Sequence, residues 1–208
     1  LCCSARNKEE LSLYLPMSNI KDIGIPLQMH EVEKLEVKAP EYDYLILGKA
    51  GIYWHTSYVY RAIKDSANLL KDANVLVRHH PGADENNRTL LEKYIQNFSV
   101  STEKKLLSDV VRADVIISFS MDALIPILYN KKKVIYIVEE EQPNIYADFH
   151  LLLPNFFIAR TIEELKAGLD YYSVEHTGFS ADYTDKLEYF FGFFEMEKTK
   201  KLFQEFIT

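Results

Sequence analysis

The stretch Ala113-Asp114-Val115-Ile116-Ile117-Ser118-Phe119-Ser120 decides the fold class of this chain. Its centre is apolar at consecutive positions rather than at alternate ones, which predicts a strand buried on both faces. Tyr44-Leu45-Ile46-Leu47 and Lys133 to Val138 are runs of the same kind. Segments with apolar residues at helical spacing lie between such runs. We therefore predict an α/β fold with a doubly wound, mostly parallel, Rossmann-like sheet of roughly six strands.

The remaining predicted elements follow from the same two periods. Further strands are expected over residues 74–77, 98–100 and 156–159. Helices are expected over residues 56–70, 87–96, 121–130, 161–169 and 195–206, with one more that Ser101 or Thr102 caps and whose first turn holds Glu103 to Lys105. Thr161 and Glu164 have the spacing of a capping box at the start of one of them. Residues 173–185 are not assigned to an element.

Composition and charge exclude several classes of protein. The chain has 208 residues, 48% of them hydrophobic, with a formal net charge of −7. An acidic chain without a basic tail is a poor general nucleic-acid binder, so no nucleic-acid partner is expected. No apolar run approaches the roughly 20 residues of a membrane-spanning helix. We expect a cytoplasmic protein with at most peripheral association at the inner face of the cell membrane.

The cysteines and the chain ends add two expectations. Cys2 and Cys3 are the only cysteines and are adjacent, which excludes a disulfide framework and favours a reducing compartment. No spaced set of metal ligands appears, so no metal is expected. Residues 1–40 lack a sustained period and are predicted to be a connector or the remnant of a preceding domain, with residues 41–208 forming the Rossmann-like domain.

The residues directly after the predicted strands are the candidates for function, because ligands of parallel sheets bind beyond the carboxyl ends of the strands. Arg78-His79-His80-Pro81 is the sharpest of these groups. An arginine supplies a bidentate donor for a phosphate, and imidazole supplies a hydrogen bond or a proton. The alternative is that these residues simply end a strand at the surface.

Two weaker groups lie at the same predicted edge. Ser118 and Ser120 precede a buried helix whose first turn holds Asp122, an arrangement that suits either an anion site or ordinary helix capping. Gly48-Lys49 follows the first strand and would let the backbone approach a phosphate, although its spacing is not that of a P-loop or a dinucleotide motif.

Three motifs in this order resemble a known family. Val75 to Pro81, Ala113 to Ser120 and Lys132 to Ile137 are similar to the series in the C-terminal, donor-binding domain of GT-B-fold bacterial glycosyltransferases. The likeness is to enzymes of capsule and cell-surface polysaccharide synthesis, including the sialyltransferase, polysialyltransferase, Kdo-transferase and CDP-glycerol glycerophosphotransferase groups. Ala159 to Leu165 and Phe191 to Ile207 resemble their late strand-to-helix step and closing helix, so the resemblance covers about residues 40–208.

The resemblance implies a glycosyltransferase whose substrate is a CMP-, UDP- or CDP-linked sugar donor and which needs no cofactor. It implies that His80 faces the donor phosphate and, as the catalytic residue, assists departure of the nucleotide. Ser118 and Ser120 would lie near the same phosphate. The hypothesis built on it adds Arg78 and His79 as holders of the leaving phosphate. Gly48, Lys49 and Asp122 complete the predicted donor-binding set.

The chain departs from the family in two places. Many relatives place a ribose-binding Glu a few residues after the Ser motif, where this chain has Leu124 to Ile127 without an acid. Either Asp122 substitutes, or donor recognition differs, or activity is lost. The relatives also carry an N-terminal domain with acceptor contacts, for which 208 residues starting at Leu1 leave no room. We therefore expect an N-terminal partner domain and a saccharide or lipid-linked acceptor.

Two other functions fit the same predicted sheet. One is a UDP-sugar 2-epimerase-like enzyme, which requires several placed carboxylates that the sequence does not reveal. The other is a non-catalytic nucleotide-binding or interaction module, which the missing Glu and the missing half favour.

Overall fold

The computed structural model describes residues 9, 13, 39–48, 64, 67–82, 93, 97–119, 123–138, 153–174, 179–192, 201–202 and 204–205. The chain divides into two compact units. One consists of Leu1–Lys34 with Phe179–Thr208, and the other is Leu35–Gly178. The second unit begins close to the predicted boundary at residue 40, whereas the residues from Phe179 onward group with the N-terminal segment. The helices predicted over 56–70, 87–96 and 195–206 lie largely outside the described residues.

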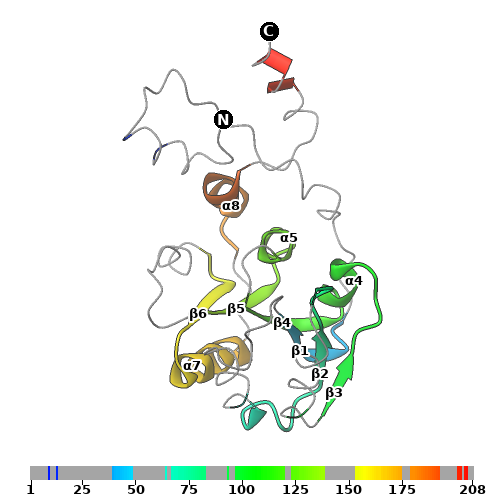
Figure 1. Cartoon of the computed structure of the whole chain (residues 1–208). Coiled ribbons are helices and arrows are strands. Elements are labelled where there is room, and N and C mark those ends of the chain that lie inside the picture. The colour runs from blue at the N-terminus through cyan, green and yellow to red at the C-terminus, as the bar shows by residue number, and fades with distance from the viewer. Residues whose placement is uncertain are drawn as a thin grey trace. The chain divides into compact units, whose positions relative to one another are not determined.

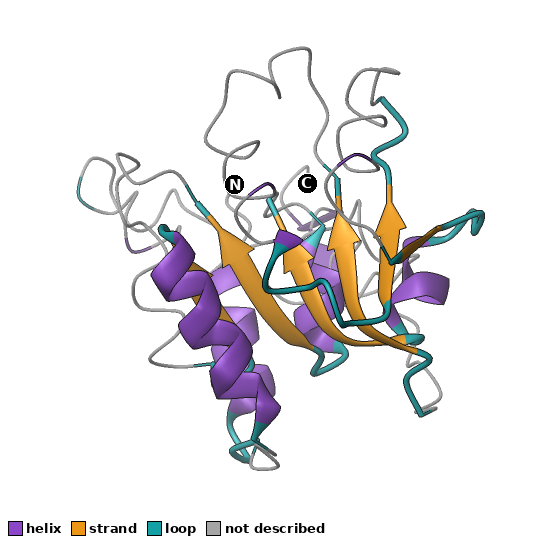
Figure 2. Cartoon of the chain, turned by 90° about the horizontal axis from the view of Figure 1, so that it is seen from below, coloured by secondary structure: helices purple, strands orange, loops and turns teal. Residues whose placement is uncertain are grey.

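The second unit contains one six-stranded sheet in which every neighbouring pair of strands is parallel. The strand arrows point to the same edge of the sheet (Figure 2). The predicted α/β class and parallel sheet are therefore confirmed, with the strand order β3-β2-β1-β4-β5-β6. The strands are β1 (Tyr42–Leu47), β2 (Val75–Arg78), β3 (Phe98–Val100), β4 (Ala113–Ser118), β5 (Lys133–Ile137) and β6 (Phe156–Ala159).

Helices pack on both faces of this sheet. α4 (Leu106–Val110) and α5 (Leu124–Tyr129) lie on one face and α7 (Ile162–Ser173) lies on the other (Figure 1). The strands are apolar at successive positions because each face must be buried under helices. Ile46, Val77 and Ile117 belong to the cluster that includes Leu165 of α7, while their neighbours Leu45, Leu76 and Ile116 are just as deeply buried.

The start of α7 agrees with the capping box seen in the sequence. The Thr161 hydroxyl accepts a hydrogen bond from the Glu164 N–H at 3.2 Å. The Glu164 carboxylate in turn accepts from the backbone N–H of Arg160 at 2.7 Å, one residue before the expected partner. These bonds satisfy N–H groups that lack a partner inside the helix.

α7 packs very closely against the sheet at Gly168. A Cβ atom at this position would lie 2.8 Å from Cδ1 of Phe157 and 3.3 Å from Cδ1 of Ile135. Because a real Cβ does not come this close, the helix can reach the sheet only with glycine there.

Two helices differ from the sequence prediction. α4 begins at Leu106, with no side-chain cap, rather than at Glu103 after a cap at Ser101 or Thr102. The prediction failed because residues 103–105 bond their carbonyl groups to a distant side chain, as described below. In the other unit, α8 (Tyr183–Phe191) begins within the residues 173–185 that the sequence left unassigned. Among the described residues, none of the helices has both the length and the apolarity needed to cross a bilayer.

Candidate functional site

The strand order changes direction at one point of the sheet, between β1 and β4. The order runs outward from β1 toward β2 and β3 on one side and from β4 toward β6 on the other. In sheets of this topology, the connections on the two sides leave a crevice outside the carboxyl ends of the two central strands, where ligands bind. Here those strands are β1 and β4. Leu47 is paired with both Arg78 of β2 and Ser118 of β4, so these two candidate residues flank the end of β1 at this edge.

Gly48 brings the end of β1 against the segment that follows β2. Its N–H donates a hydrogen bond to the Arg78 carbonyl oxygen at 2.8 Å. A Cβ at Gly48 would lie 3.3 Å from the His80 nitrogen and 3.4 Å from the His79 Cα. Because Gly48 has no side chain, the two backbones can approach each other. The structure therefore places Gly48 next to the segment Arg78–His80.

The Arg78 side chain is bonded within the protein. Its Nη1 lies 2.6 Å from Oδ2 of Asp109 and donates to the Glu103 carbonyl at 2.9 Å, while Nη2 donates to the Lys104 carbonyl at 3.0 Å. The Asp109 carboxylate also accepts a hydrogen bond from the Ser101 hydroxyl at 2.6 Å. In this arrangement the guanidinium organises the connection after β3, and its predicted contact with a phosphate stays a prediction.

Asp109 is a site residue that the sequence analysis missed. Its side chain is completely buried, and within the described part of the chain its Oδ1 has no hydrogen-bond partner. The available signal was a carboxylate close in sequence to Leu107 and Val110, which are buried in α4. A carboxylate that is buried among apolar residues needs a partner, but the sequence does not show which residue that partner is.

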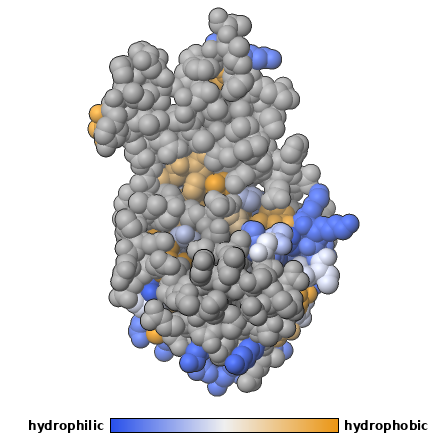
Figure 3. All heavy atoms as spheres, in the orientation of Figure 1, coloured by the Kyte–Doolittle hydropathy of each residue, from blue (hydrophilic) through white to orange (hydrophobic). Residues whose placement is uncertain are grey.

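The side chains of residues 102–105, in the connection after β3, take no part in the hydrogen bonds that the backbone of this connection makes with Arg78. Thr102 to Lys105 are exposed, and the described residues beside α4 form a hydrophilic area in the space-filling view (Figure 3). The carbonyl groups of Glu103, Lys104 and Lys105 accept hydrogen bonds from the Arg78 guanidinium. The segment is therefore held by its backbone while it presents polar side chains to solvent.

His80 is exposed and has a defined ring orientation. Its Nδ1 accepts a hydrogen bond from the Gly82 N–H at 3.0 Å. Because Nδ1 is the acceptor, the neutral ring carries its proton on Nε2. His80 can thus offer a directed N–H donor at the carboxyl edge of the sheet.

The other predicted residues divide into two groups. His79 is half-buried beside Gly48, and Ser118 is completely buried at the end of β4. Lys49, Ser120 and Asp122 lie outside the described residues, so their predicted contacts stay predictions. Among the residues that the structure describes, no group of three or more His, Cys, Asp or Glu side chains could hold a metal ion.

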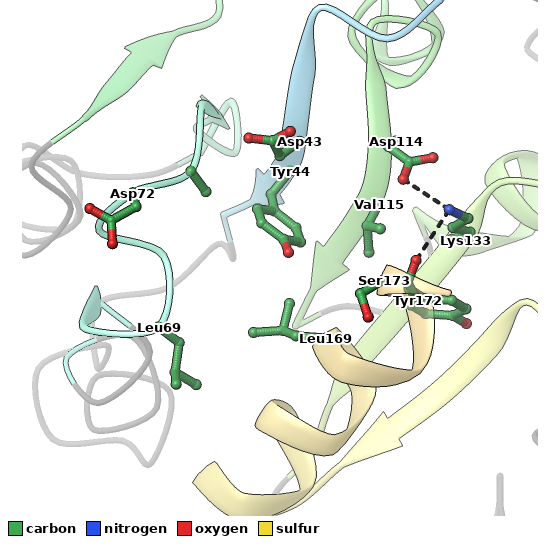
Figure 4. A pocket seen from close by; sticks show the side chains of 11 residues that line it. Asp43, Tyr44, Leu69, Asp72, Asp114, Val115, Lys133, Leu169, Tyr172 and Ser173 are labelled. Carbon is green, nitrogen blue, oxygen red and sulfur yellow. Dashed lines mark hydrogen bonds and ion pairs between the residues drawn. The ribbon is translucent and has the colours of Figure 1, made fainter. Parts of the chain in front are cut away.

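A pocket lies at the opposite, amino-terminal edge of the sheet (Figure 4). It has a volume of about 510 Å³. Lys133 donates to Asp114 at 2.9 Å within it and approaches the Tyr172 carbonyl oxygen at 3.5 Å, close to the end of α7. The pocket's lining residues lie where the strands begin, so none of them is among the candidates that directly follow a strand. The lining residues are Asp43, Tyr44, Leu69, Asp72, Ala73, Asp114, Val115, Lys133, Leu169, Tyr172 and Ser173.

The phenol of Tyr44 lies in this pocket close to several carboxylates. Burial raises the pKa of its phenol, and the negative charges of Asp43, Asp114 and Asp170 raise it further. The phenol ring extends from β1 toward the space between Leu69 and Leu169 (Figure 4). The polar groups of this edge are thus mostly acidic, which makes it a poor counterpart for a phosphate and contrasts with the Arg-His-His group at the other edge.

The fold class follows from these observations. A parallel six-stranded sheet in this order, flanked by helices, is a Rossmann-like α/β fold of the kind found in GT-B glycosyltransferases. Among solved structures, the chain is similar to the glycotransferase of kitacinnamycin, with a TM-score of 0.53 and 13% identity over 93% of this chain and 52% of that one. It is also similar to TarM, with a TM-score of 0.55 and 8% identity over 99% of this chain and 42% of that one.

These likenesses define the fold and the extent of the match. The chain spans about half the length of the two structures. No protein-family model matches the sequence, and no curated protein matches it. The activity therefore has to be argued from the site.

Proposed function

We propose that this chain is the donor-binding part of a GT-B-like glycosyltransferase that uses a nucleotide-activated sugar. The observation that carries the proposal is the close approach of Gly48 to the Arg78–His80 backbone beside the switch point of the sheet. An exposed imidazole, and a glycine whose backbone carries no side chain, suit a phosphate at this position. The fold likeness to a glycotransferase supports the same function.

The proposed chemical role of His80 follows from its orientation. In glycosyl transfer, the bond between the anomeric carbon of the sugar and the phosphate oxygen breaks, and negative charge grows on that oxygen. The Nε2–H of His80 donates a hydrogen bond to it, because Nδ1 is held by the Gly82 N–H. A well-placed donor that needs no reorientation stabilises such a charge by about 3 kcal/mol.

The other candidate residues take supporting roles in the proposal. His79 and Gly48, at the end of β1, line the phosphate position. Arg78 holds the His79-His80 segment in place. Ser118 lies at the neighbouring strand end, and we assign to Ser120, Lys49 and Asp122 the remaining contacts with the nucleotide. The complementary domain that binds the acceptor belongs to the part of a two-domain transferase that this chain does not span.

The biological setting is part of the proposal as well. The sequence resemblance favours a CMP-, UDP- or CDP-linked donor, a saccharide or lipid-linked acceptor, and bacterial surface polysaccharide synthesis on the cytoplasmic side of the membrane. Sialyltransferase, Kdo-transferase and glycerophosphotransferase chemistry differ in the donor, so the donor that binds identifies the group.

Calorimetric titration of the whole chain with CMP, UDP and CDP tests the proposal. One of the three nucleotides is expected to bind, and His80→Ala is expected to weaken it by roughly 10- to 100-fold, the value of a hydrogen bond to a charged group. His80→Gln, which keeps an N–H donor, should recover part of the loss. Lys71→Ala is the control, because Lys71 is exposed and lies before β2 rather than after it.

Two outcomes would replace the proposal. Conversion of UDP-N-acetylglucosamine into its 2-epimer would favour the epimerase-like alternative. Nucleotide binding without sugar transfer, measured with the natural neighbouring domain supplied, would favour a non-catalytic module. Binding that is absent, or unchanged in His80→Ala, would contradict the site assignment.

A further inference from the structure

We propose that Asp109 is a positioning residue for the His79-His80 segment and acts through Arg78. The inference rests on the function proposed above, since it gives a reason for holding that segment in place. It does not require Asp109 to touch the nucleotide, and its first readout needs no ligand.

The first argument is the burial of the carboxylate. Asp109 is 0% exposed, and the Arg78 side chain is 17% exposed. A buried carboxylate is costly unless it is paired and hydrogen-bonded. Oδ2 meets this requirement through Arg78 and Ser101, both at 2.6 Å, whereas Oδ1 is buried without a partner in the described part of the chain. A residue with this cost in the core of α4 calls for a role beyond packing.

The second argument is the shape of the network. The guanidinium bonds the Asp109 carboxylate and two successive carbonyl groups, those of Glu103 and Lys104. Only a planar fork with several donors can do this, so lysine would not be equivalent. The same bonds keep residues 103–105 out of the helix, and α4 therefore starts at Leu106.

The third argument is the connection to the candidate site. Arg78 is the last residue of β2, and His79 and His80 follow it directly. The backbone there is held on one side by Gly48, which donates to the Arg78 carbonyl oxygen. Its other anchor is the Arg78 side chain, which Asp109 fixes. Loss of Asp109 releases one of the two anchors while the sheet pairing of β2 remains.

The charge of the pair also bears on ligand binding. Asp109 balances the charge of Arg78, so the guanidinium is committed to the protein rather than to a phosphate. If Arg78 were instead a phosphate ligand restrained by Asp109, removing the carboxylate charge would free it and strengthen nucleotide binding. Positioning and direct binding therefore predict opposite signs for the same substitution.

Hydrogen exchange of the nucleotide-free chain tests the positioning role directly. Asp109→Asn keeps the shape of the side chain and removes its charge. We expect the Gly82 amide, which donates to His80, to lose roughly 10-fold or more of its protection. The Leu165 amide, bonded to the Thr161 carbonyl oxygen in α7, reports global stability. Equal losses at Gly82 and Leu165 would show a merely structural role and overturn the proposal.

Nucleotide titration supplies the second readout. Asp109→Asn is expected to weaken binding by about 10-fold, and Ser101→Ala, which removes one bond to the carboxylate, by about 2- to 3-fold. Arg112→Gln is the matched control. Arg112 lies just before β4 and bonds Glu41 just before β1, so this pair is at the other edge of the sheet. Tighter binding in Asp109→Asn would overturn the proposal. If Asp109→Asn does not fold, Ser101→Ala and Arg78→Lys decide it by the same two amides.

The two proposals can fail separately. If the wild-type chain binds none of the nucleotides, the proposed function fails, and the Gly82 exchange still decides whether Asp109 holds His80. If nucleotides bind and the hydrogen exchange of the Gly82 amide is unchanged in Asp109→Asn and Ser101→Ala, the function stands and the positioning role is contradicted.

Discussion

The N–H of Gly48 lies 2.8 Å from the carbonyl oxygen of Arg78, to which it donates a hydrogen bond. This bond joins the end of β1 to the end of β2 at the edge where parallel sheets bind their ligands. It also extends the pairing of the two strands beyond Leu47. The His79-His80 segment therefore starts from a fixed point.

Substitution of Gly48 tests this relationship. A Cβ would lie 3.3 Å from both the Arg78 oxygen and the His80 nitrogen, which are backbone atoms and cannot swing away. We expect Gly48→Ala to cost about 1 kcal/mol of stability and Gly48→Val about 2 to 3 kcal/mol through overpacking. Urea denaturation measures the cost. Equal stability of Gly48→Val and wild type would show that the two backbones are not in contact.

Gly168 provides a second test, on the packing of α7. Alanine normally favours a helix by about 0.5 to 1 kcal/mol over glycine. The 2.8 Å approach to the Phe157 ring should reverse this preference, because the helix must move away from the sheet. We expect Gly168→Ala to destabilise the protein by about 1 to 3 kcal/mol. A gain in thermal stability would contradict the observed packing.

The exposed neighbour of Gly168 is the matched control. Ala167 faces solvent on the same helix, so Ala167→Gly should cost only the difference in helix propensity, about 1 kcal/mol. Gly168→Ala and Ala167→Gly are opposite exchanges at adjacent positions, and only the side chain added at position 168 would contact the sheet.

Two arginine pairs should differ strongly in their contribution to stability. Arg78→Ala would leave the buried carboxylate of Asp109 without its cation, at a cost of about 3 to 5 kcal/mol. Arg112 pairs with Glu41, whose side chain is 60% exposed, so Arg112→Ala should cost about 1 kcal/mol or less. Chemical denaturation of both variants measures the difference. Equal costs would mean that the Arg78 pair is no better buried than the surface pair.

Tyr44 predicts a pH dependence at the alkaline end. Its pKa in the folded protein is raised above the ordinary 10.0 by burial and by nearby carboxylates. Above that pH the unfolded phenol releases its proton while the folded one keeps it, so the unfolded state binds fewer protons and stability falls as the pH rises. Tyr44→Phe should reduce this fall above about pH 10, where the unfolded phenol begins to release its proton. An identical slope in the variant would exclude Tyr44 as its source.

The sheet was predictable because its strands are buried on both faces. Continuous apolar runs such as Tyr44 to Leu47 and Val115 to Ile117 mark such strands without any long-range information, and the structure confirms them. The cap at Thr161 was visible for a similar reason, because it depends on residues three positions apart.

The elements that were missed depend on distant contacts or on an obscured period. The start of α4 depends on Arg78, some 25 residues away in the chain, and no local pattern reveals it. In α8, Tyr183, Leu187 and Phe191 are buried at helical spacing, but Tyr189 is also aromatic and is 38% exposed. The excess of aromatic residues therefore hid which face was apolar.

The candidate site was predictable in position and less so in detail. The topology of parallel sheets placed Gly48, Arg78, His79, His80 and Ser118 at one edge. The sequence could not show that Arg78 would be bonded to Asp109, because that pair forms only when β2 and α4 pack. It also gave no sign of the pocket at the opposite edge.

The central claim is that a nucleotide binds at the carboxyl edge of this sheet. A titration of the isotope-labelled chain with CMP, UDP and CDP, followed by amide nuclear magnetic resonance, tests it most directly. The account predicts that the amides of Gly48, His79, His80 and Phe119 shift with one saturable curve. It predicts no change at Tyr44, Val115 or Lys133 on the opposite edge. Shifts confined to that opposite edge, or none at all with any of the three nucleotides, would contradict it.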